Sequence, residues 1–301
     1  MGVVEKHSML SGFKVREAMR RQVLSLPDSK SVGKAISLLI KYKISALLLT
    51  DGDGRPSGVV SKTDIMNAYY ADFPLDQELR SIAAASPITC TEQDPLEAAL
   101  EVMRQNRIYR LYVYDQAHTR IVGLLAYPDI VGLLYRLCRS CKRNYLIQKG
   151  VREEAEVIRR FTVKEVMTPN VQSNRANDTL YTLMEALSQY RFGAVLIKDH
   201  SDNPVGVVSK TDLILAYKHG ISPERPAHEI MSSKVHGCEA SAYLAEAIQQ
   251  MIFSDIHRLF VYQDRPENIV GVLSFTDAAR VRSGSCRACL TTRIKIEDQG
   301  I

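Results

Sequence analysis

In the N-terminal part of the chain, the spacing of apolar residues changes from that of a helix to that of strands. Apolar residues recur at helical spacing over residues 32–40, which predicts an amphipathic helix with one buried face. The continuous apolar run at 46–49 predicts a buried strand, and 58–60 predicts the strand that returns after a turn at 51–54. A short strand is expected near 23–26, before the helix.

A second helix is predicted at residues 65–70. Residues 61–64 carry hydroxyl and carboxylate side chains, which favour a helix start because they accept hydrogen bonds from its first N–H groups. With the elements before it, this helix completes the order βαββα.

One phrase of this unit recurs four times: glycine, two apolar residues, a hydroxyl residue in three of the four copies, and a closing aspartate. The aspartates are 65, 83 and 65 residues apart, so the two halves of the chain are related by a shift of 148 residues. Two nested periods indicate a duplication of a duplication. The four copies are residues 58–64, 123–129, 206–212 and 271–277.

Four repeats of this kind predict the class and the domains of the protein. A unit of about 60 residues buries little core alone, so pairing of units is expected. The join at 71–79 is short, whereas the charged segment 133–161, predicted to be helical, separates the pairs. The prediction is an α+β protein with two modules, 1–150 and 151–301, whose repeats cover about 13–72, 78–137, 161–220 and 226–282.

The end of the phrase carries the candidate chemistry. An ionised carboxylate at the start of a helix can accept two hydrogen bonds from a ribose diol, and hydroxyls beside helix N–H groups can donate to a phosphate. The alternative is that these residues only cap helices. The predicted ribose and phosphate residues are Ser61, Thr63, Asp64, Ser209, Thr211, Asp212, Ser274, Thr276 and Asp277.

The second repeat departs from this pattern. It has Ala126 and Pro128 where the other copies have hydroxyls, which leaves Asp129 as its candidate ribose acceptor. A site that uses Asp129 is therefore predicted to be weak, empty or altered in specificity.

Residues at the start of the next-to-last strand of each repeat differ between odd and even copies. The even copies carry Arg110 in one case and His257 with Arg258 in the other, which suit phosphate, unless the arginines form surface ion pairs. His257 would gain charge at mildly acidic pH. The odd copies carry small or apolar residues that suit an adenine face: Ile44, Ser45, Ala46, Phe192, Gly193 and Ala194.

These motifs resemble those of the CBS domain family, whose paired form is called a Bateman module. The resemblance covers about residues 13–281, and 256–259 with 274–277 are similar to the nucleotide-binding regulatory subunit of AMP-activated protein kinase. It implies adenosine ligands in clefts between paired repeats, with Val23 and Val171 in the base pocket. It also implies a disc-like assembly of four repeats, as a monomeric disc or a homodimer.

Two C-x-x-C pairs lie 148 residues apart, after corresponding helices. Four thiolates that converge would suit zinc or an iron–sulfur cluster, and would make a metal- or thiol-based redox sensor an alternative function. The other interpretation is that they are unliganded thiols, the first pair on a buried helix face. The four residues are Cys138, Cys141, Cys286 and Cys289. Cys90 and Cys238, on an early strand, are predicted to be core.

Composition limits the remaining functions. No apolar run approaches the roughly 20 residues of a membrane span, so a cytoplasmic location is expected. The net charge of +5 is spread along the chain without a basic run typical of nucleic-acid binding. No catalytic motif is recognised. The prediction is a non-catalytic regulatory protein that binds AMP, ADP or ATP, or alternatively S-adenosylmethionine, and signals to a protein partner not identified by the sequence.

Overall fold

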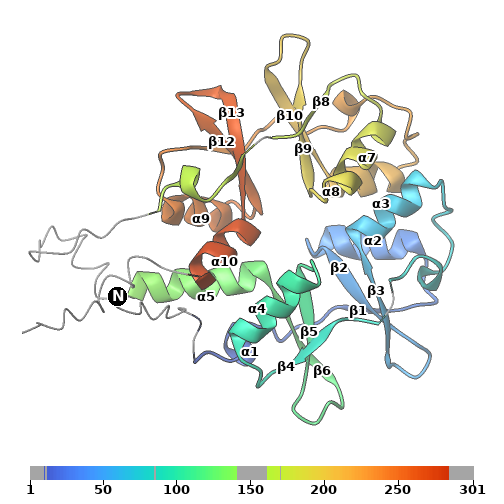
Figure 1. Ribbon diagram of the computed structural model, residues 1–301. Coiled ribbons are helices and arrows are strands. Elements are labelled where there is room, and N and C mark those ends of the chain that lie inside the picture. The colour runs from blue at the N-terminus through green and yellow to red at the C-terminus, as the bar shows by residue number, and fades with distance from the viewer. Residues whose placement is uncertain (1–9, 11, 85, 141–160, 170, 285–301) are drawn as a thin grey trace, which may run out of the picture. The chain divides into compact units, whose positions relative to one another are not determined.

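A computed structural model describes residues 10, 12–84, 86–140, 161–169 and 171–284 (Figure 1). Its elements form four copies of a βαββα unit, each preceded by a short helical turn, which confirms the predicted α+β class. The first copy consists of α1 (Val15–Ala18), β1 (Ser25–Pro27), α2 (Val32–Lys41), β2 (Ala46–Thr50), β3 (Pro56–Ser61) and α3 (Lys62–Tyr70).

The other three copies repeat this order, and the third has one additional two-residue strand, β7 (Thr168–Pro169), which pairs with β13 (Arg265–Ser274) of the fourth. The second has η1 (Leu79–Ser81), β4 (Thr89–Thr91), α4 (Leu96–Gln105), β5 (Arg110–Tyr114), β6 (Ile121–Ala126) and α5 (Tyr127–Ser140). The third has η2 (Val163–Glu165), β7 (Thr168–Pro169), β8 (Ser173–Arg175), α7 (Leu180–Gln189), β9 (Ala194–Lys198), β10 (Pro204–Ser209) and α8 (Lys210–Lys218). The fourth has η3 (Ala227–Glu229), β11 (Gly237–Glu239), α9 (Leu244–Phe253), β12 (Arg258–Gln263), β13 (Arg265–Ser274) and α10 (Phe275–Gly284).

Each copy builds one small sheet with a parallel and an antiparallel pair. In the first copy β1 lies parallel to β2, and β2 lies antiparallel to β3. Helix α3 begins at Lys62, three residues before the predicted start. The reason is the Ser61 hydroxyl, which accepts hydrogen bonds from the N–H groups of Thr63 and Asp64.

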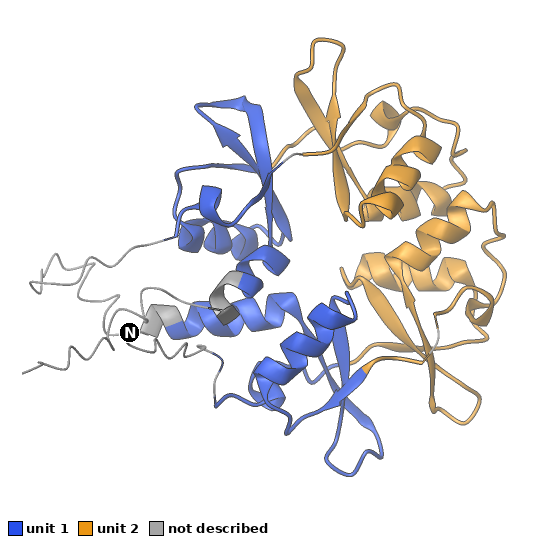
Figure 2. Cartoon of the chain, viewed as in Figure 1, with its two compact units in different colours: residues 1–22, 89–169, 237–301 blue, residues 23–88, 170–236 orange. Residues whose placement is uncertain are grey.

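The described chain divides into two compact units, each of which takes one repeat from each half of the sequence (Figure 2). Unit 1 contains residues 1–22, 89–169 and 237–301, and therefore joins the second repeat to the fourth, together with the short segments that open the first and third repeats. Unit 2 contains residues 23–88 and 170–236, and joins the first repeat to the third. The two modules predicted from the halves of the chain stay a prediction.

Unit 2 is held by the last helices of its two repeats. Helices α3 and α8 pack against each other, and the fully buried Ile65, Met66, Leu213 and Ile214 belong to one hydrophobic core. In unit 1, α5 packs against α10 in the same way, with the buried Ile130 and Leu134 of α5 and Ala278 of α10 in one core.

The segment that leads into a repeat crosses the sheet of another repeat at the phrase glycine. In unit 1, Arg20 and Leu124 exchange two backbone hydrogen bonds of 2.9 Å, and β7 pairs with β13. A Cβ at Gly123 would lie 2.8 Å from the Arg20 carbonyl oxygen, closer than real contacts allow. Gly206 in unit 2 has the same relation to the Ser232 carbonyl oxygen, at 2.8 Å. The absence of a side chain at this glycine therefore lets the backbone of the crossing segment pack against the strand.

No helix among the described residues combines the length and the apolar character that crossing a bilayer requires.

Candidate functional site

The serine and aspartate of each Ser-x-Thr-Asp sequence form a capping box. Ser61 donates to Asp64 Oδ2 from both its backbone N–H and its hydroxyl, each at 2.7 Å. Ser209 and Asp212 repeat these bonds at 2.7 Å. In the fourth repeat the Ser274 hydroxyl lies 2.6 Å from Asp277 Oδ2 and its N–H lies 2.9 Å away.

Helix capping, the alternative weighed for these residues, is thus present in all three copies. It uses only one oxygen of each carboxylate for the cap. A ligand role for the same residues stays a prediction, since a capped aspartate keeps a second oxygen that can accept a hydrogen bond.

The threonines of the odd repeats bind lysines that sequence reasoning missed. Lys210 Nζ lies 2.8 Å from Thr63 Oγ1, and Lys62 Nζ lies 2.7 Å from Thr211 Oγ1. The two bonds cross between the first and third repeats inside unit 2. The signal was present in the phrase, because its fifth position is lysine in both odd repeats and aromatic in both even ones.

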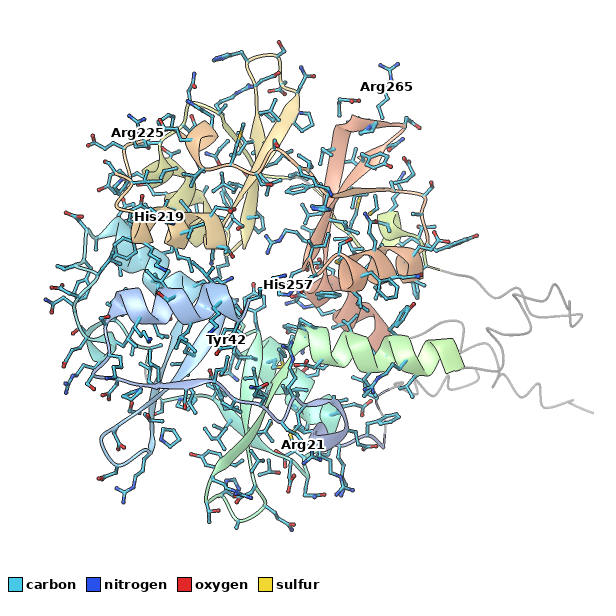
Figure 3. All side chains as sticks on the ribbon, turned by 180° about the vertical axis from the view of Figure 1, so that it is seen from behind. Arg21, Tyr42, His219, Arg225, His257 and Arg265 are labelled. Carbon is cyan, nitrogen blue, oxygen red and sulfur yellow. The ribbon has the colours of Figure 1, made fainter. Side chains whose placement is uncertain are left out.

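The strand register brings the predicted phosphate residues beside the phrase of their own repeat. Arg258 pairs with Ser274 across β12 and β13, and Arg110 pairs with Ala126 across β5 and β6. The backbone N–H of Phe275 donates to the carbonyl of His257 at 3.2 Å. Figure 3 accordingly shows His257 at the end of the hairpin where α10 begins.

The odd repeats place small residues at the corresponding positions. Ala46 pairs with Ser61, and Ala194 pairs with Ser209. All the residues predicted for the base pocket lie in unit 2, and their contact with adenine stays a prediction: Val23, Ile44, Ser45, Ala46, Val171, Phe192, Gly193 and Ala194.

The pKa values of two charged groups in unit 1 are shifted by their surroundings. Withdrawal from water lowers the pKa of Arg258, an effect that Tyr109 and Asp277 oppose. Burial raises the pKa of Asp129, although Arg20 and Arg110 favour its ionised form. Each even repeat therefore contains a charged group that is partly desolvated. In the fourth repeat, Asp277 is a nearby opposite charge for Arg258.

Asp129 and Asp277 differ in what touches their outer oxygens. Arg20 Nε donates to Asp129 Oδ1 at 2.5 Å, while Asp129 Oδ2 accepts from the Ala126 N–H at 2.9 Å. The residue 148 positions after Arg20 is Thr168, whose hydroxyl lies 3.5 Å from Asp277 Oδ1. No motif in the sequence marks Arg20 as a partner of Asp129.

The cysteine predictions have different outcomes. Cys90 and Cys238 are buried on β4 and β11, as predicted, and burial raises the pKa of Cys90 to about 12 and that of Cys238 to about 11. The predicted metal ligands, which lie outside the residues whose side chains are described, are Cys138, Cys141, Cys286 and Cys289. Among the described residues, no group of three histidine, cysteine or acidic side chains could hold a metal ion.

Comparison with known proteins places this geometry in a family. The CBS domain pattern matches residues 15–71, 79–136, 163–219 and 227–284, which together make up most of the chain. The chain therefore belongs to the CBS domain family and contains four CBS domains, as its motifs predicted.

Two solved structures share the fold over nearly the whole chain. Protein MJ1225 of Methanocaldococcus jannaschii, a candidate archaeal homologue of g-AMPK, is 15% identical with a TM-score of 0.72, over 89% of this chain and 99% of that one. An uncharacterised conserved protein of Pyrococcus horikoshii is 18% identical with a TM-score of 0.58, over 90% of this chain and 100% of that one.

Curated relatives also include enzymes in which the similarity is partial. Homoserine O-acetyltransferase of Methanocorpusculum labreanum is 29% identical over 116 residues, which are 38% of this chain. The match spans only 23% of that enzyme.

Proposed function

We propose that this chain is a non-catalytic regulatory protein that binds an adenine nucleotide through the helix starts of its CBS domains. The observation that carries the proposal is the grouping at the start of α10. Arg258 lies opposite Ser274 in the β12–β13 ladder, and Asp277 is hydrogen-bonded to the same serine.

The chemistry of this grouping suits a nucleoside phosphate. Asp277 Oδ2 is committed to the cap, while the contact that Oδ1 accepts within the described part of the chain is a 3.5 Å contact from Thr168, so Oδ1 can accept a stronger hydrogen bond from a ribose hydroxyl. A guanidinium that is already partly desolvated gains more from a phosphate than one in bulk water, because its attraction to the anion is less screened.

Signalling would follow from a difference in affinity. A nucleotide that binds one arrangement of the repeats better than another shifts the population toward that arrangement, and a protein partner could respond to the shift.

Isothermal titration of the full chain with AMP, ADP, ATP and S-adenosylmethionine tests the proposal. We expect binding of at least one adenine nucleotide, and a preference for S-adenosylmethionine would favour the alternative ligand. Asp277→Asn and Arg258→Met should each lower the affinity by about tenfold to a hundredfold, the effect of losing one hydrogen bond to a charged group.

The same hairpin offers matched controls. Arg265 is an exposed arginine at the opposite end of the β12–β13 hairpin (Figure 3), and Asp264 is an exposed aspartate at its turn. Arg265→Met and Asp264→Asn make the same charge changes away from α10 and should bind as the unchanged chain does. If none of these adenosine compounds gives a binding signal in the titration, the proposal is wrong.

A further inference from the structure

Backbone hydrogen bonds hold Arg20 next to the sheet of the second repeat. Arg20 lies between α1 and β1 at the start of the first repeat, yet it belongs to unit 1 and exchanges two 2.9 Å backbone hydrogen bonds with Leu124 of β6. Gly123 lets this segment approach, as described above. The position of Arg20 is therefore set by the sheet, and its side chain starts beside the beginning of α5.

The carboxylate of Asp129 is satisfied on both oxygens. Its Oδ1 accepts from Arg20 Nε at 2.5 Å, and its Oδ2 accepts from the Ala126 N–H at 2.9 Å. The Asp129 side chain is only 8% exposed, whereas that of Arg20 is 52% exposed. A charge-assisted bond to a nearly buried carboxylate is among the stronger hydrogen bonds in proteins. A ribose diol would have to displace a guanidinium to reach Oδ1.

The second half of the chain provides the comparison. At the position equivalent to Arg20 stands Thr168, and its hydroxyl contacts Asp277 Oδ1 at 3.5 Å, the upper limit of a hydrogen bond. A neutral hydroxyl at this distance can rotate to donate or accept elsewhere, so it leaves Oδ1 open to a ligand.

We infer that Arg20 is a specificity-determining residue that closes the carboxylate of the second repeat to ribose, so that Asp277 and not Asp129 is the ribose acceptor of unit 1. This inference rests on the proposed function and deepens it, since it names the side chain that excludes the nucleotide. It also supplies a cause for the weak second site that the loss of hydroxyls at Ala126 and Pro128 predicts.

The electrostatics of Asp129 agree with this role. Burial raises the pKa of Asp129, and Arg20 is the largest influence in the opposite direction. Removal of Arg20 would leave a buried carboxylate without that partner, which favours its neutral form at higher pH.

A reciprocal exchange between the two halves tests the inference. Arg20→Thr gives the second repeat the residue of the fourth, and the chain should bind one more AMP than the unchanged protein in isothermal titration. Thr168→Arg gives the fourth repeat the residue of the second, and AMP affinity at Asp277 should fall by tenfold or more.

Two controls assign the effect to the ion pair. Arg21→Thr makes the same charge change at the neighbouring exposed residue and should leave the number of bound AMP molecules unchanged. Asp129→Asn, added to Arg20→Thr, should abolish the additional site. Carbon-13 NMR titration of the Asp129 carboxyl gives a readout without nucleotide, in which Arg20→Thr should raise its pKa.

The outcomes separate the two proposals. If the unchanged chain binds AMP and Arg20→Thr binds the same number with an unshifted Asp129 titration, nucleotide binding stands and the role of Arg20 is overturned. An additional AMP that survives Asp129→Asn also overturns it. If no variant binds AMP, both the proposed function and the inference that rests on it fail.

Discussion

The two units use the same phrase in different ways. In unit 2 each contact occurs twice: Lys62 binds Thr211 and Lys210 binds Thr63. In unit 1 the corresponding contacts differ, because Asp129 has an arginine as its partner whereas Asp277 has a distant threonine hydroxyl.

A substitution within the phrase explains why the crossed bonds of unit 2 are absent from unit 1. The lysines of the odd repeats are replaced by Tyr127 and Phe275 in the even ones, so lysine–threonine bonds cannot form in unit 1. In unit 2 the polar groups of the phrase join two repeats, while in unit 1 they remain beside Arg110, His257 and Arg258. One fold thus carries two versions of one motif, one that joins two repeats and one that we propose binds the ligand.

Truncation of the helix residue that follows each aspartate should have the largest effect. Ile65, Leu213 and Ile130 are fully buried at this position, whereas the fourth repeat already has Ala278. Replacing any one of the three by alanine should lower the free energy of unfolding by about 2–5 kcal/mol, because a cavity is left. Urea unfolding measures this loss.

Leu215→Ala, at an exposed position on α8, is the control for these truncations and should cost much less. A loss below about 1 kcal/mol for Ile65→Ala or Leu213→Ala would mean that unit 2 is not held by its helix pair.

Substitution of the phrase glycine should lower stability by a similar amount in both units. At this position the two units therefore do not differ. A Cβ at Gly206 or Gly123 would meet a backbone carbonyl at 2.8 Å, so alanine at either should cost about 1–3 kcal/mol. Gly132 on α5 has open space around it, and alanine there should stabilise the chain by up to about 1 kcal/mol, because glycine is unfavourable within a helix. Thermal unfolding of the three variants decides, and a neutral Gly206→Ala would show that the leading segment does not dock as described.

Local patterns predicted much of this fold. The helical period at residues 32–40 and the apolar run at 46–49 correspond to α2 and β2, and the phrase located all four repeats. Cys90 and Cys238 were correctly predicted as core. These features depend on neighbours in the sequence, which is why periodicity and capping residues reveal them.

Long-range packing was not visible in the sequence. Repeats one and three share a compact unit through α3 and α8, a contact that no motif in the sequence marks. Arg20 and Asp129 are 109 residues apart, and no sequence motif contains both of them. The crossed lysines depend likewise on two helix starts that meet only after folding.

Alkaline pH should weaken unit 2 through two stacked tyrosines. The rings of Tyr69 and Tyr217 lie 4.8 Å apart, and their hydroxyls donate to the carbonyls of Ile221 and Phe73. Burial raises the pKa of each to about 12. Unfolded tyrosine titrates near 10, so their contribution to stability is complete below about pH 10 and is lost as the pH rises to about 12.

The double variant Tyr69→Phe with Tyr217→Phe should lose about 0.5–1.5 kcal/mol per hydrogen bond at neutral pH. It should also unfold with a shallower dependence on pH between about 10 and 12. Tyr112 of unit 1 and the buried thiols, which titrate in the same range, account for the slope that remains. An unchanged slope in the double variant would contradict the burial of these hydroxyls.

The crossed lysine bonds should give the smallest effect. Both partners are only half-buried, so the pair Lys62–Thr211 should contribute a coupling of about 0.5–1 kcal/mol, measured by urea unfolding of Lys62→Met, Thr211→Val and the double variant. The cycle removes the other interactions of Lys62, since they cancel between the single and double variants. Because unit 2 repeats its contacts, the pair Lys210–Thr63 should give an equal coupling. A clear coupling in one pair and none in the other would mean that unit 2 is as asymmetric as unit 1, and that the division of the motif into a structural and a ligand-binding version fails.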